Sequence, residues 1–253
     1  MKKIIVISDT HCGHYMGITP PEYMTQEEPI KTISLDLWCW FCEQLNPSGY
    51  DYMLHAGDII DGAGRKDNTF LLTTDPLKQG KIAKTVIEKI GARKHYFCYG
   101  TPYHVSGDSD FESPVSEYFG DKISWLRKLE IEGVKFNLAH TIGKSTSPVG
   151  GDIALRKQIV WNYLLDVKES GESADVIIRG HAHEYRALLD ADTTAFICPS
   201  LKIGNADYDR YGRKMQGGHY HVGFVEIDVD NGKIVRYEPK IYKYNFESKY
   251  EVV

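Results

Sequence analysis

Short apolar runs alternate with longer stretches of helical spacing along the first hundred residues. Continuous β-branched and aromatic runs predict buried strands at 3–8, 52–56 and 94–99. Between them, apolar residues recur at intervals of three and four residues over 30–45 and 76–90, which predicts two amphipathic helices. A strand, helix, strand, helix, strand order favours a parallel sheet with the helices packed on its face.

After residue 120 the pattern becomes that of paired strands. Two alternating runs, 123–131 and 134–139, flank Glu132-Gly133 and predict an antiparallel hairpin. A further helix is expected over 151–167. More strands are expected at 174–179, 184–189, 194–198, 219–228 and 233–242, the last two joined by a hairpin turn at Asp230-Asn231-Gly232. No repeat or linker interrupts the chain, so we expect one domain over 1–253 built on two mixed sheets, in the α/β (α+β) class.

Acidic residues and histidines follow these apolar runs. The carboxyl ends of parallel strands form the edge at which α/β sheets bind ligands. Most of these side chains offer nitrogen or oxygen donors suited to zinc, manganese or iron rather than to calcium. The residues at the strand ends are Asp9, His11, Asp58, Thr101, His104, His140, His181 and His183. His55 lies inside a run instead, where a core position is the simpler interpretation.

Composition and charge exclude some classes of partner. The 253 residues are 42% hydrophobic and 26% charged, as in an ordinary globular protein. A formal net charge of −5 argues against a broadly cationic surface for long nucleic acid, although a local basic groove is compatible with it. No stretch is long enough to span a membrane, and the apolar run after Met1-Lys2-Lys3 is too short for a signal peptide.

The cysteine count favours a reducing compartment. Five cysteines, an odd number, are expected as free thiols in a soluble, cytoplasmic protein. Cys39 and Cys42 have the spacing of a redox or zinc pair. They fall on a predicted helix with no second pair, so packing is the preferred interpretation.

The strand-end motifs resemble those of the calcineurin-like metallophosphoesterase family. The matching segments are Asp9-x-His11, Gly57-Asp58-x-x-Asp61, a glycine turn with His104, the lone His140 and Gly180-His181-x-His183. The resemblance implies a four-layer α-β-β-α sandwich of two mixed sheets flanked by helices. It also implies two divalent metal ions. Mn²⁺ is the preferred candidate, and Zn²⁺, Fe²⁺ and Ni²⁺ are the alternatives. One ion would be held by Asp9, His11 and His183, the other by His140 and His181, with Asp58 bridging them.

One motif departs from the family pattern. Where the family has Gly-Asn-His, this chain has Gly100-Thr101-Pro102-Tyr103-His104. Thr101, a poor ligand, replaces the asparagine that completes the second metal's shell, so the affinity of that site is in question. His104 is expected to act as the general acid, the alternative being a metal ligand in place of the asparagine. Asp61 is expected to orient a ligand histidine.

The resemblance predicts a phosphoester hydrolase that uses a metal-bridging hydroxide as nucleophile. A phosphodiesterase or nuclease acting on nucleic acid or nucleotides is the first hypothesis; the alternatives are a phosphomonoesterase and a catalytically weak metal-binding scaffold. Cations interleaved with aromatics over 202–218 are typical of phosphate and base contacts, the alternative being a solvated loop. The expected substrate contacts are Thr101, Arg65, Arg210 and Arg213. The sequence specifies no oligomeric state.

Overall fold

The computed structural model describes residues 1–62, 70–102, 110–143, 152–169, 173–190, 192–204 and 220–244. The elements match the sequence-based prediction closely. Helix α2 (Pro76–Ile90) starts after the Asp75 side chain caps the amide of Leu77, and it stops at Gly91, which has a φ of 69°. Helix α1 (Ile30–Gln44) ends just before Asn46-Pro47.

The first sheet has the strand order β10-β9-β1-β2-β3. Its strands β1 (Lys2–Ile7), β2 (Tyr50–His55) and β3 (Ala92–Phe97) pair in parallel, as predicted. The hairpin of β9 (Val222–Asp230) and β10 (Lys233–Tyr242) adds to β1 in antiparallel orientation. The sheet is therefore mixed.

The second sheet has the order β4-β5-β6-β8-β7. Strands β5 (Val134–Ala139), β6 (Val176–Arg179) and β8 (Thr194–Ile197) are parallel. The edge strands β4 (Leu126–Ile131) and β7 (Arg186–Leu189) are antiparallel to their neighbours. The predicted hairpin about Glu132-Gly133 is present, although β4 begins three residues later than expected. This sheet is also mixed.

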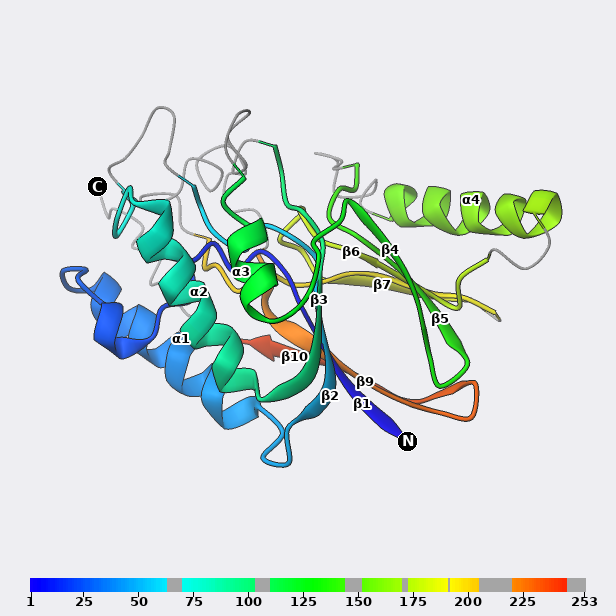
Figure 1. The fold of residues 1–253 in the computed structure, drawn as a ribbon, viewed down its shortest axis with the longest axis horizontal. Helices are drawn as coiled ribbons and strands as arrows, with labels where there is room; N and C mark the ends of the chain where they lie inside the picture. The colour runs from blue at the N-terminus through cyan, green and yellow to red at the C-terminus, as the bar shows by residue number, and fades with distance from the viewer. Residues whose placement is uncertain are drawn as a thin grey trace, which may run out of the picture.

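Three clusters of buried apolar side chains lie between the four layers of helices and sheets. In β1, Ile5 and Ile7 pack against α1 and α2, whereas Ile4 and Val6 point to the second sheet. This alternation, with both faces covered, explains why the strand is a continuous apolar run. On the far side, Ile177 of β6 packs under α4 (Ile153–Glu169). Figure 1 shows α1 and α2 beside the first sheet and α4 along the second, which is the expected α-β-β-α sandwich.

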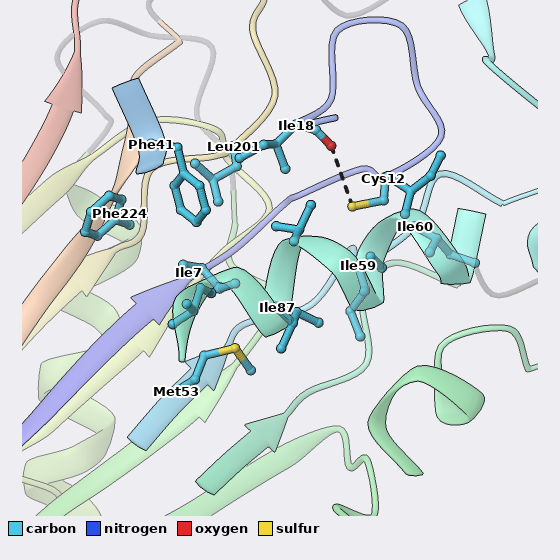
Figure 2. Close-up of a cluster of buried hydrophobic side chains, with 14 of the residues drawn as sticks. Ile7, Cys12, Ile18, Phe41, Met53, Ile59, Ile60, Ile87, Leu201 and Phe224 are labelled. Atoms are coloured by element: carbon cyan, nitrogen blue, oxygen red, sulfur yellow. Dashed lines mark hydrogen bonds between the residues drawn. The ribbon is translucent and has the colours of Figure 1, made fainter. Parts of the chain in front are cut away.

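Figure 2 shows the packing between the helices and the first sheet, where side chains from α1, α2, β1, β2 and β9 meet. Phe41 of α1 lies edge-on against Phe224 of β9, with ring centroids 5.7 Å apart. Cys42 packs partly buried against this cluster, whereas Cys39 is exposed. All five cysteines are free, as expected.

Two short elements had no sequence-based prediction, the 3₁₀ turn η1 (Pro21–Tyr23) and helix α3 (Ser113–Tyr118). Both are too short to show a helical apolar period. Within the described residues, none of the helices combines the length and the apolar character that crossing a bilayer requires.

Candidate metal centre

Six side chains at the ends of four strands converge on one edge of the sandwich. The loops after β1 and β2 supply three of them, and those after β5 and β6 supply the other three. They form two groups, within each of which the ligand atoms lie within 4.8 Å of one another. The groups are Asp9, His11 and His183, and Asp58, His140 and His181. These are the six residues that the resemblance in sequence implied as ligands of two metals.

Most of these residues have an unusual backbone conformation. Five of the six have positive φ, a region that costs non-glycine residues about 1–3 kcal/mol each and that collects at functional sites. Aspartate and histidine enter this region more readily than β-branched residues. The five are Asp9 (51°), His11 (42°), Asp58 (52°), His181 (70°) and His183 (55°). The turns aim the side chains inward at the expense of local stability.

The first group surrounds one carboxylate oxygen of Asp9. Asp9 Oδ2 accepts a hydrogen bond of 3.0 Å from the amide of His181, whereas Oδ1 is buried and has no hydrogen-bond partner in the described part of the chain. His183 Nε2 lies 3.2 Å from this Oδ1 and 3.2 Å from His11 Nε2. Burial raises the pKa of the Asp9 carboxyl, but His183 and His140 outweigh it and bring the pKa well below the usual value. The carboxylate is therefore ionised.

Asp61 fixes the tautomer of His11. Its Oδ1 lies 2.8 Å from His11 Nδ1. Burial raises the pKa of Asp61, but His14, His11 and Lys202 lower it by more, so the net pKa is well below the usual value. The carboxylate is therefore ionised and accepts the hydrogen bond from His11 Nδ1. His11 Nε2 then presents a lone pair to the group, as a metal ligand must. This is the orienting contact that the sequence suggested for Asp61.

In the second group an imidazole nitrogen faces a carboxylate oxygen. His140 Nδ1 donates to the carbonyl of Ala56 at 2.7 Å, so Nε2 is the nitrogen left for a ligand. Nε2 lies 3.2 Å from Asp58 Oδ2. Burial lowers the pKa of His140, but Asp58 and Asp9 together raise it to about 10. A positive charge is therefore favoured beside Asp58, and either the second ring proton of His140 or a divalent cation held by these nitrogen and oxygen donors would supply it. The residues present fit the implied metal.

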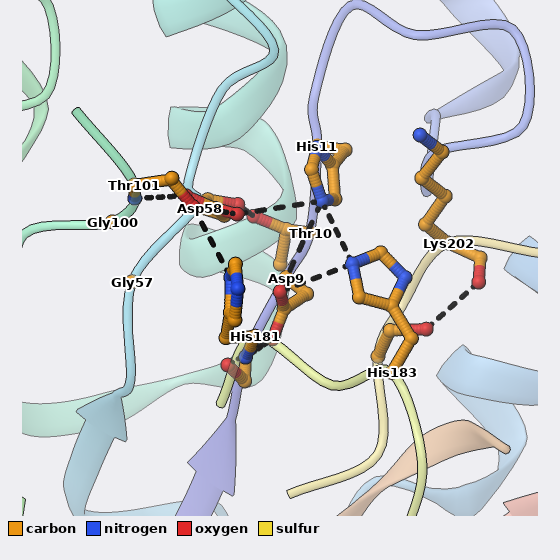
Figure 3. A network of polar contacts seen from close by, with 12 residues as sticks. Asp9, Thr10, His11, Gly57, Asp58, Gly100, Thr101, His181, His183 and Lys202 are labelled. Carbon is orange, nitrogen blue, oxygen red and sulfur yellow. Dashed lines mark hydrogen bonds and ion pairs between the residues drawn. The ribbon is translucent and has the colours of Figure 1, made fainter. Parts of the chain in front are cut away.

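Thr101 lies against the second group, beside Asp58 (Figure 3). Its amide donates to Asp58 Oδ1 at 2.6 Å. Its hydroxyl oxygen is 3.1 Å from Asp58 Oδ2 and 3.2 Å from His140 Nε2. The sequence placed this residue among the substrate contacts, and in the structure it lies beside the second group of candidate metal ligands.

His55 is a core histidine, as expected. Thr10 Oγ1 lies 3.1 Å from its Nε2, and the amide of Gly57 donates to its Nδ1 at 3.1 Å. Burial lowers the pKa of His55 to about 3, so the ring stays neutral. It supports the turn that carries Asp58 from beneath.

Sequence reasoning missed Glu112. This side chain is fully buried, and its two oxygens accept the amides of Ile59 at 2.7 Å and Gly100 at 2.8 Å. Burial, followed by the charge of Asp58, raises its pKa to about 7. Glu112 does not end a strand and belongs to none of the motifs, so no sequence pattern marked it.

Lys202 opens the basic segment 202–218. Its side chain is buried, and its charge contributes to the lowered pKa of Asp61. Four other residues named from the sequence lie outside the described residues: His104, Arg65, Arg210 and Arg213.

Comparison with known proteins gives a family match over most of the chain. A family model described as calcineurin-like phosphoesterase matches residues 2–185. No curated protein matches the sequence.

Several solved structures are similar in overall arrangement. Vps29 from Entamoeba histolytica complexed with zinc has 14% identity and a TM-score of 0.49, over 96% of this chain and 99% of that one. Vps29 from Chaetomium thermophilum has 11% identity and a TM-score of 0.49, over 96% and 97%. A novel archaeal phosphodiesterase has 16% identity and a TM-score of 0.45, over 95% and 99%. At these values none of the three carries a conclusion about function.

Proposed function

Because the chain belongs to the calcineurin-like phosphoesterase family, we propose that it hydrolyses phosphoric esters with two divalent cations bound at the edge of the sandwich. The observation that supports this most directly is the convergence of carboxylate oxygens and imidazole nitrogens from four strand ends on two groups of candidate ligands. Asp9 Oδ1 has no hydrogen-bond partner in the described chain, and Asp58 Oδ2 faces His140 Nε2. Buried groups of this kind are stable only around positive charge.

The six residues divide the work of holding the cations. Asp9, His11 and His183 would hold one ion, His140 and His181 the other, and Asp58 would be shared between them. When bound, such a pair supplies an activated water as nucleophile and neutralises the charge on the phosphate oxygens. Manganese is our first choice of metal and zinc the second, since nitrogen and oxygen donors without thiolate suit both.

The chain's other residues would orient the ligands and handle the leaving group. Asp61 holds His11 with its Nε2 lone pair directed inward. We assign protonation of the leaving oxygen to His104, on the sequence motif alone. Arg65, Arg210 and Arg213 are proposed to contact the phosphate. An imidazole acid favours a poor, alkoxide leaving group, so we propose a phosphodiester of nucleic acid or nucleotide as substrate.

The five free thiols, three of them buried, suit a reducing compartment, so we propose a cytoplasmic location.

The proposal is tested by hydrolysis of two generic esters. The purified chain is stripped with a chelator, reloaded with Mn²⁺ or Zn²⁺, and assayed with bis(p-nitrophenyl) phosphate and p-nitrophenyl phosphate. We expect metal-dependent turnover, faster on the diester, and loss of activity in His140→Ala. Monoester turnover far above diester turnover would instead identify a phosphomonoesterase. A single tightly held ion and no hydrolysis of either ester would indicate a binding scaffold.

A further inference from the structure

The hydroxyl of Thr101 lies at nearly equal distances from three ligand atoms. Its oxygen is 3.1 Å from Asp58 Oδ2, 3.2 Å from His140 Nε2 and 3.3 Å from His181 Nδ1. Asp58 Oδ2 and His140 Nε2 are themselves 3.2 Å apart. The Thr101 hydroxyl oxygen thus lies 3.1–3.3 Å from one donor atom of each residue of the second group.

The spacing of these atoms is that of a metal shell. The Thr101 hydroxyl has a single proton and donates to only one of its three neighbours. In a tetrahedral shell with bonds of about 2.0 Å, donor atoms lie about 3.3 Å from one another. The observed separations of 3.1–3.3 Å match that spacing.

We propose that the Thr101 hydroxyl completes the second cation site, together with Asp58, His140 and His181, and that Glu112 is the positioning residue for it. This inference rests on the proposed function, because it concerns the same metal centre. It assigns this chain's own replacement for the amide ligand that the sequence motif lacks.

Glu112 holds together the two turns that meet at this site. Its carboxylate accepts the amides of Ile59 and Gly100, which are the neighbours of Asp58 and Thr101 in sequence. The turns touch directly, because a Cβ on Gly100 would lie 2.1 Å from Asp58 Oδ1 and 2.3 Å from the Asp58 amide nitrogen. The short Thr101 amide contact to Asp58 Oδ1 then leaves Oδ2 to face both groups.

The two sites differ in ligand charge. The first has the carboxylate of Asp9 to itself and shares that of Asp58, whereas the second has only the shared carboxylate. A neutral hydroxyl adds no charge and is a weak donor. The two cations should therefore bind in separate steps, the step at the Thr101 site being the weaker.

Isothermal titration of Zn²⁺ into the chelator-stripped full chain tests this. The wild type should show two steps, and His183→Ala should remove the tighter one. Thr101→Val keeps the shape and loses the hydroxyl, so we expect the weaker step to lose at least about tenfold in affinity. Thr101→Ser, the matched control, should retain it. Glu112→Gln loses one hydrogen-bond acceptor and should weaken the same step, while the affinity of the tighter step stays close to that of the wild type. The thermal midpoint of the two Thr101 variants should also stay close to that of the wild type.

The outcomes separate this inference from the proposed function. A wild-type second step in Thr101→Val, or a wild type that binds one Zn²⁺ only, overturns the role of Thr101 while the first site stands. Equal weakening of both steps in Glu112→Gln overturns its positioning role. No Zn²⁺ binding by the wild type overturns both the inference and the proposed function.

Discussion

Asp61 offers the sharpest test of how the centre is held. Asp61→Asn keeps the shape and an oxygen facing His11 Nδ1 but removes the charge, and Asp61→Ala removes both. The contact is short, at 2.8 Å, and shielded, with side-chain exposures of 3% for His11 and 13% for Asp61. The carboxylate is ionised, since its pKa lies well below the usual value. The hydrogen bond therefore acts at full charge and with little screening by solvent.

Loss of such an orienting partner typically costs 10–100-fold in metal affinity, or about 1.4–2.7 kcal/mol. We expect Asp61→Asn near the lower value. Asp61→Ala should be near the upper value because it leaves a buried N–H without its acceptor. The assay is Zn²⁺ titration of the stripped chain, read at the tighter step.

The weaker step is the internal control, because Asp61 orients His11, which belongs to the first group. Equal, wild-type affinity of both variants at the tighter step would refute the orienting role. Loss at both steps together would show that Asp61 acts on the fold instead. In either case Asp61 would not act by fixing the tautomer of His11.

Three further outcomes are expected. The pKa of His55 is about 3 in the folded chain and about 6.5 in the unfolded chain, so the unfolded state binds a proton more readily. The free energy of unfolding is therefore unaffected by His55 above about pH 6.5 and decreases as the pH drops below that value. Urea unfolding at pH 7.5 and 5.0 should show about 2 kcal/mol less acid loss in His55→Gln than in wild type; identical losses would contradict this. Gly100→Ala should cost about 1–3 kcal/mol by crowding Asp58. The control is Gly80→Ala, at a position inside α2 where the added Cβ would lie 3.5 Å from Val115, an ordinary contact distance. This variant should be more stable than wild type by about 0.5–1 kcal/mol; a similar effect of both substitutions would contradict the steric explanation. Chelator should lower the thermal midpoint of purified, metal-loaded protein, and a midpoint independent of Zn²⁺ concentration would exclude binding to the folded state.

The sequence determined the elements and most of the centre because both depend on local pattern. A strand buried on both faces must be apolar throughout, so β1 and β6 were visible as runs. Gly91 in the sequence also indicated where helix α2 ends. The ligand types were visible for the same reason, since each follows the end of a strand. Which sheet each later strand joins was not visible, because β9 and β10 carry the same kind of pattern as strands of the other sheet.

Only the tertiary structure decided how the ligands are supported. Glu112 is 53 residues from one of its amide partners and 12 from the other, and nothing in its own neighbourhood in the sequence points to either. The positive φ of Asp9 and Asp58 and the place of the Thr101 hydroxyl likewise follow from the approach of separate turns. The sequence states which side chains are present at each strand end. Hydrogen bonds and steric contacts between distant turns decide the direction in which those side chains point.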